Sequence, residues 1–147
     1  VPLQMVEFYL ILAAVTAVAG SLFWQLLLGS LVMLIFGFMG EAGIMAAMPA
    51  FVIGMAAWLY MIYVLYMGAG KSVVSTTSAS VQTAYNSLLL IIVVGWSIYP
   101  LGYVFGYLMG AVDASTLNLI YNLADFVNKI LFGLVIWKAA VDDKQTA

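Results

Sequence analysis

An aspartate and a lysine, four residues apart, lie inside the last long apolar stretch of the chain. This stretch covers residues 117–138 and is long enough to cross a bilayer, which takes about 20 helical residues. Asp125 and Lys129 fall near its middle, where each charge costs about 2.5 to 3.5 kcal/mol when it faces lipid. On a helix they share a face with Asn118 and Asn122. The spacing therefore predicts a narrow polar stripe that faces a protein interior.

Two interpretations of this pair remain open. In the first, Asp125 and Lys129 form a buried ion pair that locks the helix into a bundle, with the aspartate on the favourable N-terminal side. In the second, the lysine amine forms a Schiff base with an aldehyde, since apolar surroundings disfavour a charged amine and leave it free to react. The aspartate would then balance the charge of the protonated imine.

Composition predicts an integral membrane protein and excludes several chemistries. The 147 residues are 67% hydrophobic and 7% charged, against about 25% charged residues in soluble domains. Without cysteine there is no disulfide, thiolate nucleophile or iron–sulfur cluster. Without histidine there is no imidazole–metal site, histidine-ligated haem or Ser-His-Asp triad. No basic cluster indicates nucleic acid binding. We therefore expect an all-α membrane helical bundle with no metal site.

The chain reads as five membrane segments separated by Gly- and Ser-rich connections. The longest connection starts at residue 68 and continues through a Ser/Thr-rich stretch to Ser80, a residue able to cap the next helix. We expect the segments at residues 1–18, 22–40, 44–67, 80–108 and 116–139.

The few charges outside the segments predict the orientation of the chain. Five crossings place Lys71, Lys144 and the C-terminus on one side of the membrane, and Glu41 and Asp113 on the other. Excess lysine marks the cytoplasmic side, so the C-terminus is expected inside the cell.

A carboxyl group, Glu7, lies within the first predicted segment. On the orientation above it lies to the cytoplasmic side of Pro2. A carboxyl in hydrocarbon surroundings can stay protonated until a proton is demanded, which would suit a proton donor. The alternative is a neutral glutamate hydrogen-bonded within the bundle.

The fourth predicted segment presents aromatic side chains on one helical face. Pro100 removes a backbone hydrogen bond within it and is expected to kink the helix. Such a face can form one wall of a pocket for a conjugated apolar ligand, or it can simply pack against neighbouring helices. Trp58 and Tyr60, in the third predicted segment, slightly favour the pocket. The spacing of Gly102, Gly106 and Gly110 predicts close helix packing. The aromatic residues of this face are Trp96, Tyr99, Tyr103 and Tyr107.

Taken together, these residues resemble the microbial rhodopsins, and the proteorhodopsins in particular. The run NLIYNLADFVNKILFG at residues 118–133 is similar to the family's seventh helix, and WSIYP at 96–100 to its sixth-helix W-x-x-Y-P motif. GEAGIM at 40–45 is similar to the junction of the fourth and fifth helices. The resemblance covers essentially the whole chain. It implies part of a seven-transmembrane-helix fold, with residues 1–147 as one transmembrane domain running from a partial third helix to the seventh helix and a short tail.

The resemblance also implies a cofactor and the residues that hold it. In the family, the lysine that matches Lys129 carries all-trans retinal as a protonated Schiff base. The residues that match Trp96, Tyr99 and Pro100 wall the retinal, and Trp58 is a further candidate for that wall.

Three polar residues acquire expected roles from the same resemblance. Asp125 matches one carboxylate of the counterion complex, and Glu7 matches the cytoplasmic proton donor. Gln4 falls at the position whose Gln or Leu identity distinguishes blue- from green-absorbing proteorhodopsins, and predicts the blue type.

The function implied is a light-driven outward proton pump of the cell inner membrane, a transporter and photoreceptor with no enzymatic activity. Its expected partners are retinal, protons, the lipid bilayer and further copies of itself. A photosensor with a slow photocycle and a non-catalytic bundle with a structural Asp-Lys pair remain as alternatives. The family's primary proton acceptor would lie upstream of Val1, so we expect this chain to be the C-terminal portion of a longer protein and not to pump by itself.

Overall fold

A computed structural model describes the backbone of residues 1–146 and the side chains of residues 1–142. Its regular elements within that range are all helical, which confirms the predicted fold class. The elements are α1 (Pro2–Ala13), α2 (Gly20–Glu41), α3 (Ala47–Tyr66), α4 (Ala69–Val74), α5 (Ala79–Val93), η1 (Gly95–Ser97), α6 (Ile98–Tyr103), η2 (Val104–Leu108) and α7 (Ala114–Thr146).

Four helical stretches are long and apolar enough to cross a bilayer, and they match the second to fifth predicted segments. The first segment was predicted to reach residue 18, but α1 ends at Ala13. Its 12 residues rise about 18 Å, short of the roughly 30 Å of hydrocarbon. Helix α1 ends where Val15 and Thr16, both β-branched, follow in the sequence. The four stretches are Gly20–Glu41, Ala47–Val74, Ala79–Leu108 and Ala114–Asp142.

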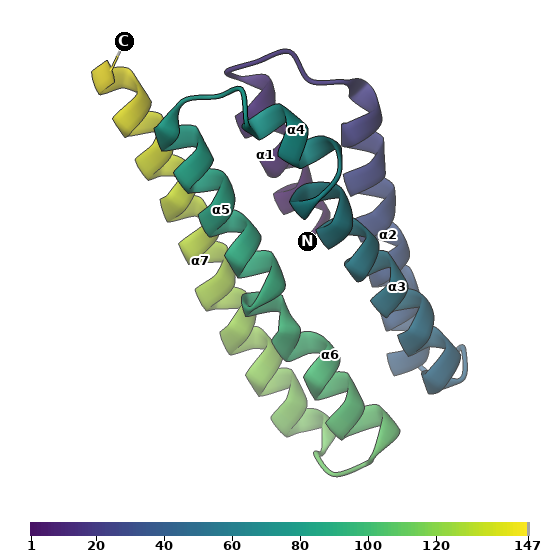
Figure 1. Ribbon diagram of the computed structural model, residues 1–147. Helices are drawn as coiled ribbons and strands as arrows, with labels where there is room; N and C mark the ends of the chain where they lie inside the picture. Colours follow the sequence, from purple (N-terminus) through teal and green to yellow (C-terminus); the bar gives the residue numbers. More distant parts are fainter. Residues whose placement is uncertain (147) are drawn as a thin grey trace.

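The long helices form a bundle whose connections alternate between its two ends (Figure 1). Helices α2 and α3 pack along each other, as do α5 and α7, and α1 packs against both α2 and α5. The α1–α2 connection, α4 and the C-terminus lie at one end. The α2–α3 connection and the turn before α7 lie at the other end. Lys71 in α4 and the C-terminus therefore share an end, as the sequence predicted.

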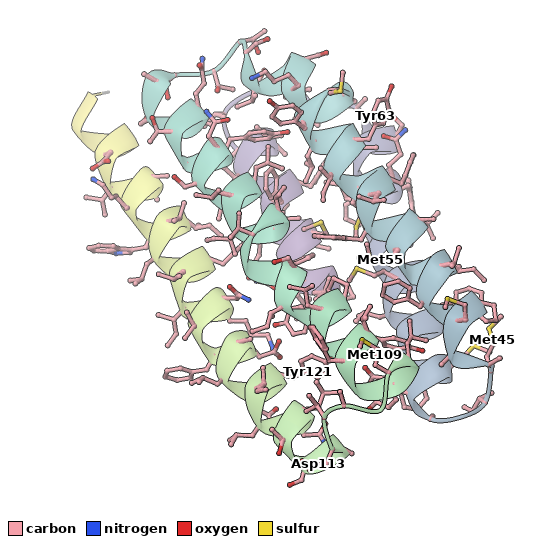
Figure 2. The ribbon with its side chains drawn as sticks, turned by 60° about the horizontal axis from the view of Figure 1, so that its bottom comes forward. Met45, Met55, Tyr63, Met109, Asp113 and Tyr121 are labelled. Carbon is pink, nitrogen blue, oxygen red and sulfur yellow. The ribbon has the colours of Figure 1, made fainter. Side chains whose placement is uncertain are left out.

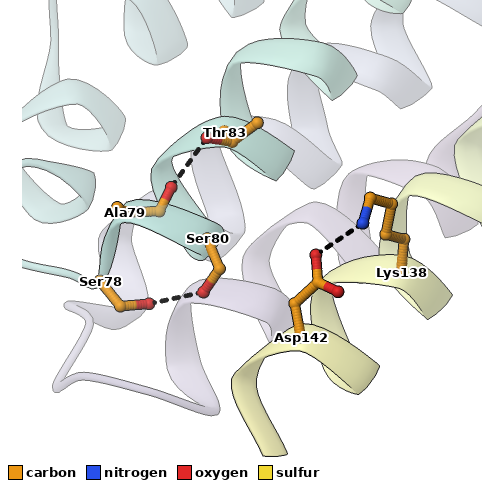
Figure 3. Close-up of polar contacts among 6 residues, drawn as sticks. All are labelled: Ser78, Ala79, Ser80, Thr83, Lys138 and Asp142. Atoms are coloured by element: carbon orange, nitrogen blue, oxygen red, sulfur yellow. Dashed lines mark hydrogen bonds and ion pairs between the residues drawn. The ribbon is translucent and has the colours of Figure 1, made fainter. Parts of the chain in front are cut away.

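The longest connection is partly helical, which corrects the expectation of a loop. Residues Ala69–Val74 form α4, and the cap of the next helix is Ser78 rather than Ser80. The amide of Val81 donates to Ser78 Oγ at 3.5 Å, and the hydroxyls of Ser78 and Ser80 lie 3.0 Å apart (Figure 3). Helix α5 therefore begins at Ala79, one residue earlier than predicted.

The fourth predicted segment departs from α-helical geometry before and after Pro100. A 3₁₀ turn, η1, precedes it, and a π-helical turn, η2, follows α6. Helix α5 ends at Val93, one residue after Ile92. Trp58 of α3 donates its indole N–H to the carbonyl of Ile92 at 3.2 Å, so α3 is tied to the interruption.

The GxxxGxxxG spacing packs α6 and η2 against α7, as predicted. A Cβ on Gly102 would lie 2.6 Å from Tyr121 Cε1, and one on Gly106 would lie 2.6 Å from Leu117 Cδ2. Gly110 has a φ of 63°, in the left-handed region that favours glycine, and turns the chain toward α7. Glycine at positions 102 and 106 therefore lets this part of the chain approach α7 closely.

Candidate functional site

A cavity of about 380 Å³ lies between α2, α3, α6 and α7, with Trp96 of η1 in its wall. Figure 2 labels Met55 on α3 and Tyr121 on α7, two residues that line it from different helices. Its volume is in the range of sites that hold small organic ligands, roughly 300 to 1,000 Å³. The elements that form it are far apart in the sequence, and the bundle brings them together.

Aromatic side chains wall much of the cavity. Trp58, Trp96, Tyr99 and Pro100 all line it, so the structure brings together the four residues expected to wall a ligand. Tyr103 lines it as well, with its ring stacked on Phe51 at a centroid distance of 5.4 Å.

Two aromatic residues from the sequence analysis lie elsewhere. Tyr60 lines a separate outer groove between α2 and α3. Tyr107 lies in η2 and does not belong to the cavity lining. Of the predicted aromatic face, the part that lines the cavity is therefore the N-terminal part, from Trp96 to Tyr103.

The carboxylate of Asp125 lines the cavity and is held from two sides. The Tyr99 hydroxyl donates to one of its oxygens, and the ammonium group of Lys129 donates to the other. The Tyr121 hydroxyl donates to the backbone carbonyl of Tyr99 at 3.0 Å. This bond ties Tyr99 to α7. Because both oxygens of the carboxylate have a donor, its orientation is fixed.

The expectation that the whole polar stripe faces a protein interior is corrected. Asn122 and Asp125 line the cavity, but Asn118 and Asn122 are exposed, and 54% of the Lys129 side chain and 41% of the Asp125 side chain are exposed. Helix α7 packs on α5, α6 and η1, and Lys129 is on an exposed part of it. Lys129 does not line the cavity; its amine donates to Asp125, which does.

Gln4 and Glu7 occupy different environments on α1. Gln4 is 7% exposed, and its Nε2 has no hydrogen-bond partner among the described residues. Glu7, one helical turn further on, is exposed. Neither residue lines the cavity, so their expected roles stay predictions.

Sequence reasoning missed two polar residues at this site. Asn128 is 7% exposed and donates from Nδ2 to the carbonyl of Gly95 at 3.0 Å, where α5 is interrupted. Its position next to Lys129 in the sequence is the signal that could have identified it as a site residue. Glu41 was treated as a loop charge, yet it lines the same cavity as Asp125. No local pattern links two residues so far apart in the sequence.

Comparison with known proteins identifies the class to which this fold and site belong. A family model described as bacteriorhodopsin-like protein matches residues 1–142. The chain therefore belongs to the bacteriorhodopsin-like family.

The relatives it resembles include two proteorhodopsins. It is 68% identical over 149 residues to a blue-light absorbing proteorhodopsin of Gamma-proteobacterium Hot 75m4, covering 100% of this chain and 59% of the relative. It is 66% identical over 148 residues to a green-light absorbing proteorhodopsin of Gamma-proteobacterium EBAC31A08, with the same coverage. The chain thus spans about three fifths of the length of these relatives.

A solved structure gives the same classification. The crystal structure of a blue light-absorbing proteorhodopsin from Med12 superimposes with a TM-score of 0.79 at 46% identity. The match covers 97% of this chain and 62% of that chain.

Proposed function

We propose that the protein is a light-driven outward proton pump that holds all-trans retinal on Lys129. The observation that supports this most directly is the run of contacts from Lys129 through Asp125 to Tyr99 at the wall of an aromatic cavity. Membership of the bacteriorhodopsin-like family and the similarity to light-absorbing proteorhodopsins support it as well.

The residues around the cavity fit retinal. Retinal is elongated, apolar and conjugated, and the flat rings of Trp58, Trp96 and Tyr99 offer it apolar faces. Its aldehyde requires a primary amine, and Lys129 provides one beside a fixed carboxylate. When bound, retinal supplies the absorption of visible light and a change of shape that drives transport.

Asp125 stabilises positive charge on the Lys129 nitrogen. A lone cation in a low-dielectric site costs several kcal/mol, and an adjacent carboxylate offsets much of that cost. Tyr99 keeps this carboxylate oriented by donating to its other oxygen. Asp125 therefore serves as a counterion whose position does not depend on water.

Glu7 is proposed to return a proton to the Lys129 nitrogen from the cytoplasmic side. Helix α1 starts at the cavity, which Val1 lines, and runs toward the end that holds α4 and the C-terminus (Figure 1). Glu7 lies six residues further along, a rise of about 9 Å toward that end. Lys71 lies at this end, and excess lysine marks the cytoplasmic side of a membrane protein. We therefore assign this end to the cytoplasm and the protein to the cell inner membrane.

Two further expectations remain proposals. Gln4, a buried amide without a partner for its Nε2 in the described part of the chain, is proposed to tune absorption toward the blue. Assembly into a homo-oligomer is proposed from the resemblance to the family.

The experiment that tests this function adds all-trans retinal to the full-length protein in membranes. A visible absorption band should form, and Lys129→Ala should abolish it. Illuminated cells should acidify the medium, and a proton-conducting uncoupler should remove the signal. A band with no change of pH would favour a photosensor. Absence of a band, or a band that survives Lys129→Ala, would favour a structural Asp-Lys pair.

A further inference from the structure

The interruption between α5 and α6 is held by side chains from two other helices. Trp58 of α3 donates its indole N–H to the carbonyl of Ile92, at the end of α5. Asn128 of α7 donates from Nδ2 to the carbonyl of Gly95 at 3.0 Å, at the first residue of η1. The interruption therefore has one tie to α3 and another to α7.

The backbone after the interruption has fewer helical hydrogen bonds of its own. Pro100 has no amide hydrogen, so it cannot donate to the carbonyl of Trp96 four residues earlier. Turn η1 is 3₁₀ rather than α-helical over Gly95–Ser97, and 3₁₀ turns have a poorer hydrogen-bond geometry. A side chain that donates to this turn thus contributes more to its position than it would in a regular α-helix.

Asn128 and Gly95 fit together closely. A Cβ on Gly95 would lie 2.3 Å from Asn128 Oδ1 and 3.1 Å from its Cγ. Asn128 is 7% exposed, so water competes little for its bond to the Gly95 carbonyl. A side chain added at position 95 and an amide removed at position 128 therefore disturb the same contact from its two sides.

This contact joins the residue before Lys129 to the residue before Trp96. Lys129 is the lysine proposed to bind retinal, and Trp96 lines the cavity with 3% of its surface exposed. Trp96 also belongs to the buried hydrophobic cluster that includes Phe132 of α7. Asn128 therefore fixes one wall of the cavity relative to the proposed attachment point of retinal.

We propose that Asn128 is a positioning residue that holds the Trp96 wall of the cavity in place and thereby sets how fast the protein returns to its resting state after light. Asn128 does not line the cavity, so it acts through the backbone of Gly95. Its carboxamide does not titrate, so it takes no part in proton transfer. This inference rests on the proposed retinal-binding function and adds the residue that fixes a wall of the site.

The first test measures the return of the visible band after a flash in the retinal-loaded full-length protein. A wall that is free to move accommodates the light-formed shape of retinal as well as the resting shape, so the preference for the resting state falls. In Asn128→Ala the return should be several-fold slower than in the wild type. Gly95→Ala should slow it similarly, since the added Cβ displaces the Asn128 amide. The double variant should be no slower than the slower single variant, because one contact is lost in all three.

Matched controls separate this contact from the general effect of each substitution. Asn86→Ala removes an exposed amide on α5, and Gly20→Ala adds a Cβ with nothing within 4 Å of it. Both controls should return at the wild-type rate. Asn128→Gln keeps the donor on a longer side chain and should recover part of the wild-type rate. A residue that only stabilises the fold would lower the thermal unfolding midpoint and leave the return rate of the folded pigment unchanged.

A second readout needs neither retinal nor light. Hydrogen–deuterium exchange of the retinal-free full-length protein reports how readily the backbone amides of residues 94–99 open. Exchange of these amides should be several-fold faster in Asn128→Ala and in Gly95→Ala than in the wild type. Exchange within α2 should keep its wild-type rate in both variants.

The outcomes separate the positioning role from retinal binding itself. A wild-type return rate in Asn128→Ala and Gly95→Ala overturns the positioning role. A double variant in which the two delays multiply overturns it as well, because the two residues would then act independently. Where neither variant binds retinal, wild-type exchange at residues 94–99 overturns it. A wild-type protein that forms no visible band overturns the proposed function, and the positioning role with it.

Discussion

At the scale of single residues, the site depends on the positions of its charged groups and on the hydrogen bonds that they make. Asp125 has a donor on each oxygen, from Tyr99 and Lys129, and is therefore suited to a constant negative charge. Glu7 and Glu41, in contrast, are exposed and make no hydrogen bond to the described residues. The two kinds of carboxyl group call for different tests.

Replacing Glu7 with glutamine tests its role as the proton donor. The amide cannot supply a proton, so recovery of the resting state after a flash should slow by roughly 100-fold, the lower end of what a positioned general acid contributes. Recovery should also become faster at lower pH, since protons must then come from the medium. Flash spectroscopy at two pH values measures both effects. A Glu7→Gln protein that recovers as fast as the wild type would remove the donor role.

Asp113 makes the first turn of α7 sensitive to pH. Its carboxylate accepts from the amides of Ser115 and Thr116, each at 3.0 Å, and from the Thr116 hydroxyl at 2.6 Å. These bonds favour the charged form and hold the pKa of Asp113 below its ordinary value, with those from Thr116 as the main cause. The stabilisation is complete above the pKa of the unfolded chain, about 3.9, and is lost as pH falls through the lower folded value.

Thermal unfolding followed by circular dichroism should reveal this cap. Asp113→Ala should lower the unfolding midpoint at pH 7, because the first turn of α7 loses its acceptors. The gap from the wild type should close at pH 2, where the aspartic acid is protonated. Asp113→Asn, which still accepts hydrogen bonds, should show less dependence on pH than the wild type. A gap between wild type and Asp113→Ala that persists at pH 2 would contradict the account.

At the scale of elements, the contact between α6 and α7 depends on the absence of a side chain at Gly102. An added Cβ would lie 2.6 Å from Tyr121 Cε1 and 2.8 Å from Leu117 Cδ1. Gly102→Ala should therefore lower the free energy of unfolding by roughly 1 to 3 kcal/mol, as overpacking does. Gly20→Ala is the control, since nothing lies within 4 Å of a Cβ there. Equal stability of the two variants in a detergent unfolding titration would refute the contact.

The sequence predicted helices correctly where a long apolar run determines their position. The second to fifth predicted segments correspond to helical stretches, but the early end of α1 at Ala13 and the short α4 were missed. Both lie at the end of the bundle, where local turns rather than apolar length determine the backbone. Pro100 predicted an interruption, and the structure adds that Trp58 donates to the carbonyl of Ile92 just before it.

At the scale of the whole molecule, Phe8 joins three helices in the core. Its ring is 1% exposed, meets Tyr85 of α5 edge-on at 4.8 Å and lies 6.4 Å from Phe132 of α7. Phe8→Ala should lower the free energy of unfolding by roughly 3 to 5 kcal/mol. Phe126→Ala, at a side chain 65% exposed, should change it by about 0.5 kcal/mol or less. Similar losses for the two variants would place Phe8 outside the core.

The candidate site was predictable where one helix contains it and was missed where several helices meet. Helical periodicity placed Asp125 beside Lys129, and the structure pairs them. Tyr99 as a donor to Asp125 and Glu41 as a second cavity carboxyl depend on packing between distant segments. A single sequence contains no periodic signal for such contacts.

The most direct test of the account asks which amine binds retinal. The chain has four lysines and no arginine, so the choice is among Lys71, Lys129, Lys138 and Lys144. Borohydride reduction of the retinal-loaded protein under illumination fixes the linkage, and mass spectrometry of the digested protein locates it. We predict the retinyl label on Lys129 alone. A label on any other lysine, or no label in a protein that shows the visible band, would contradict the account.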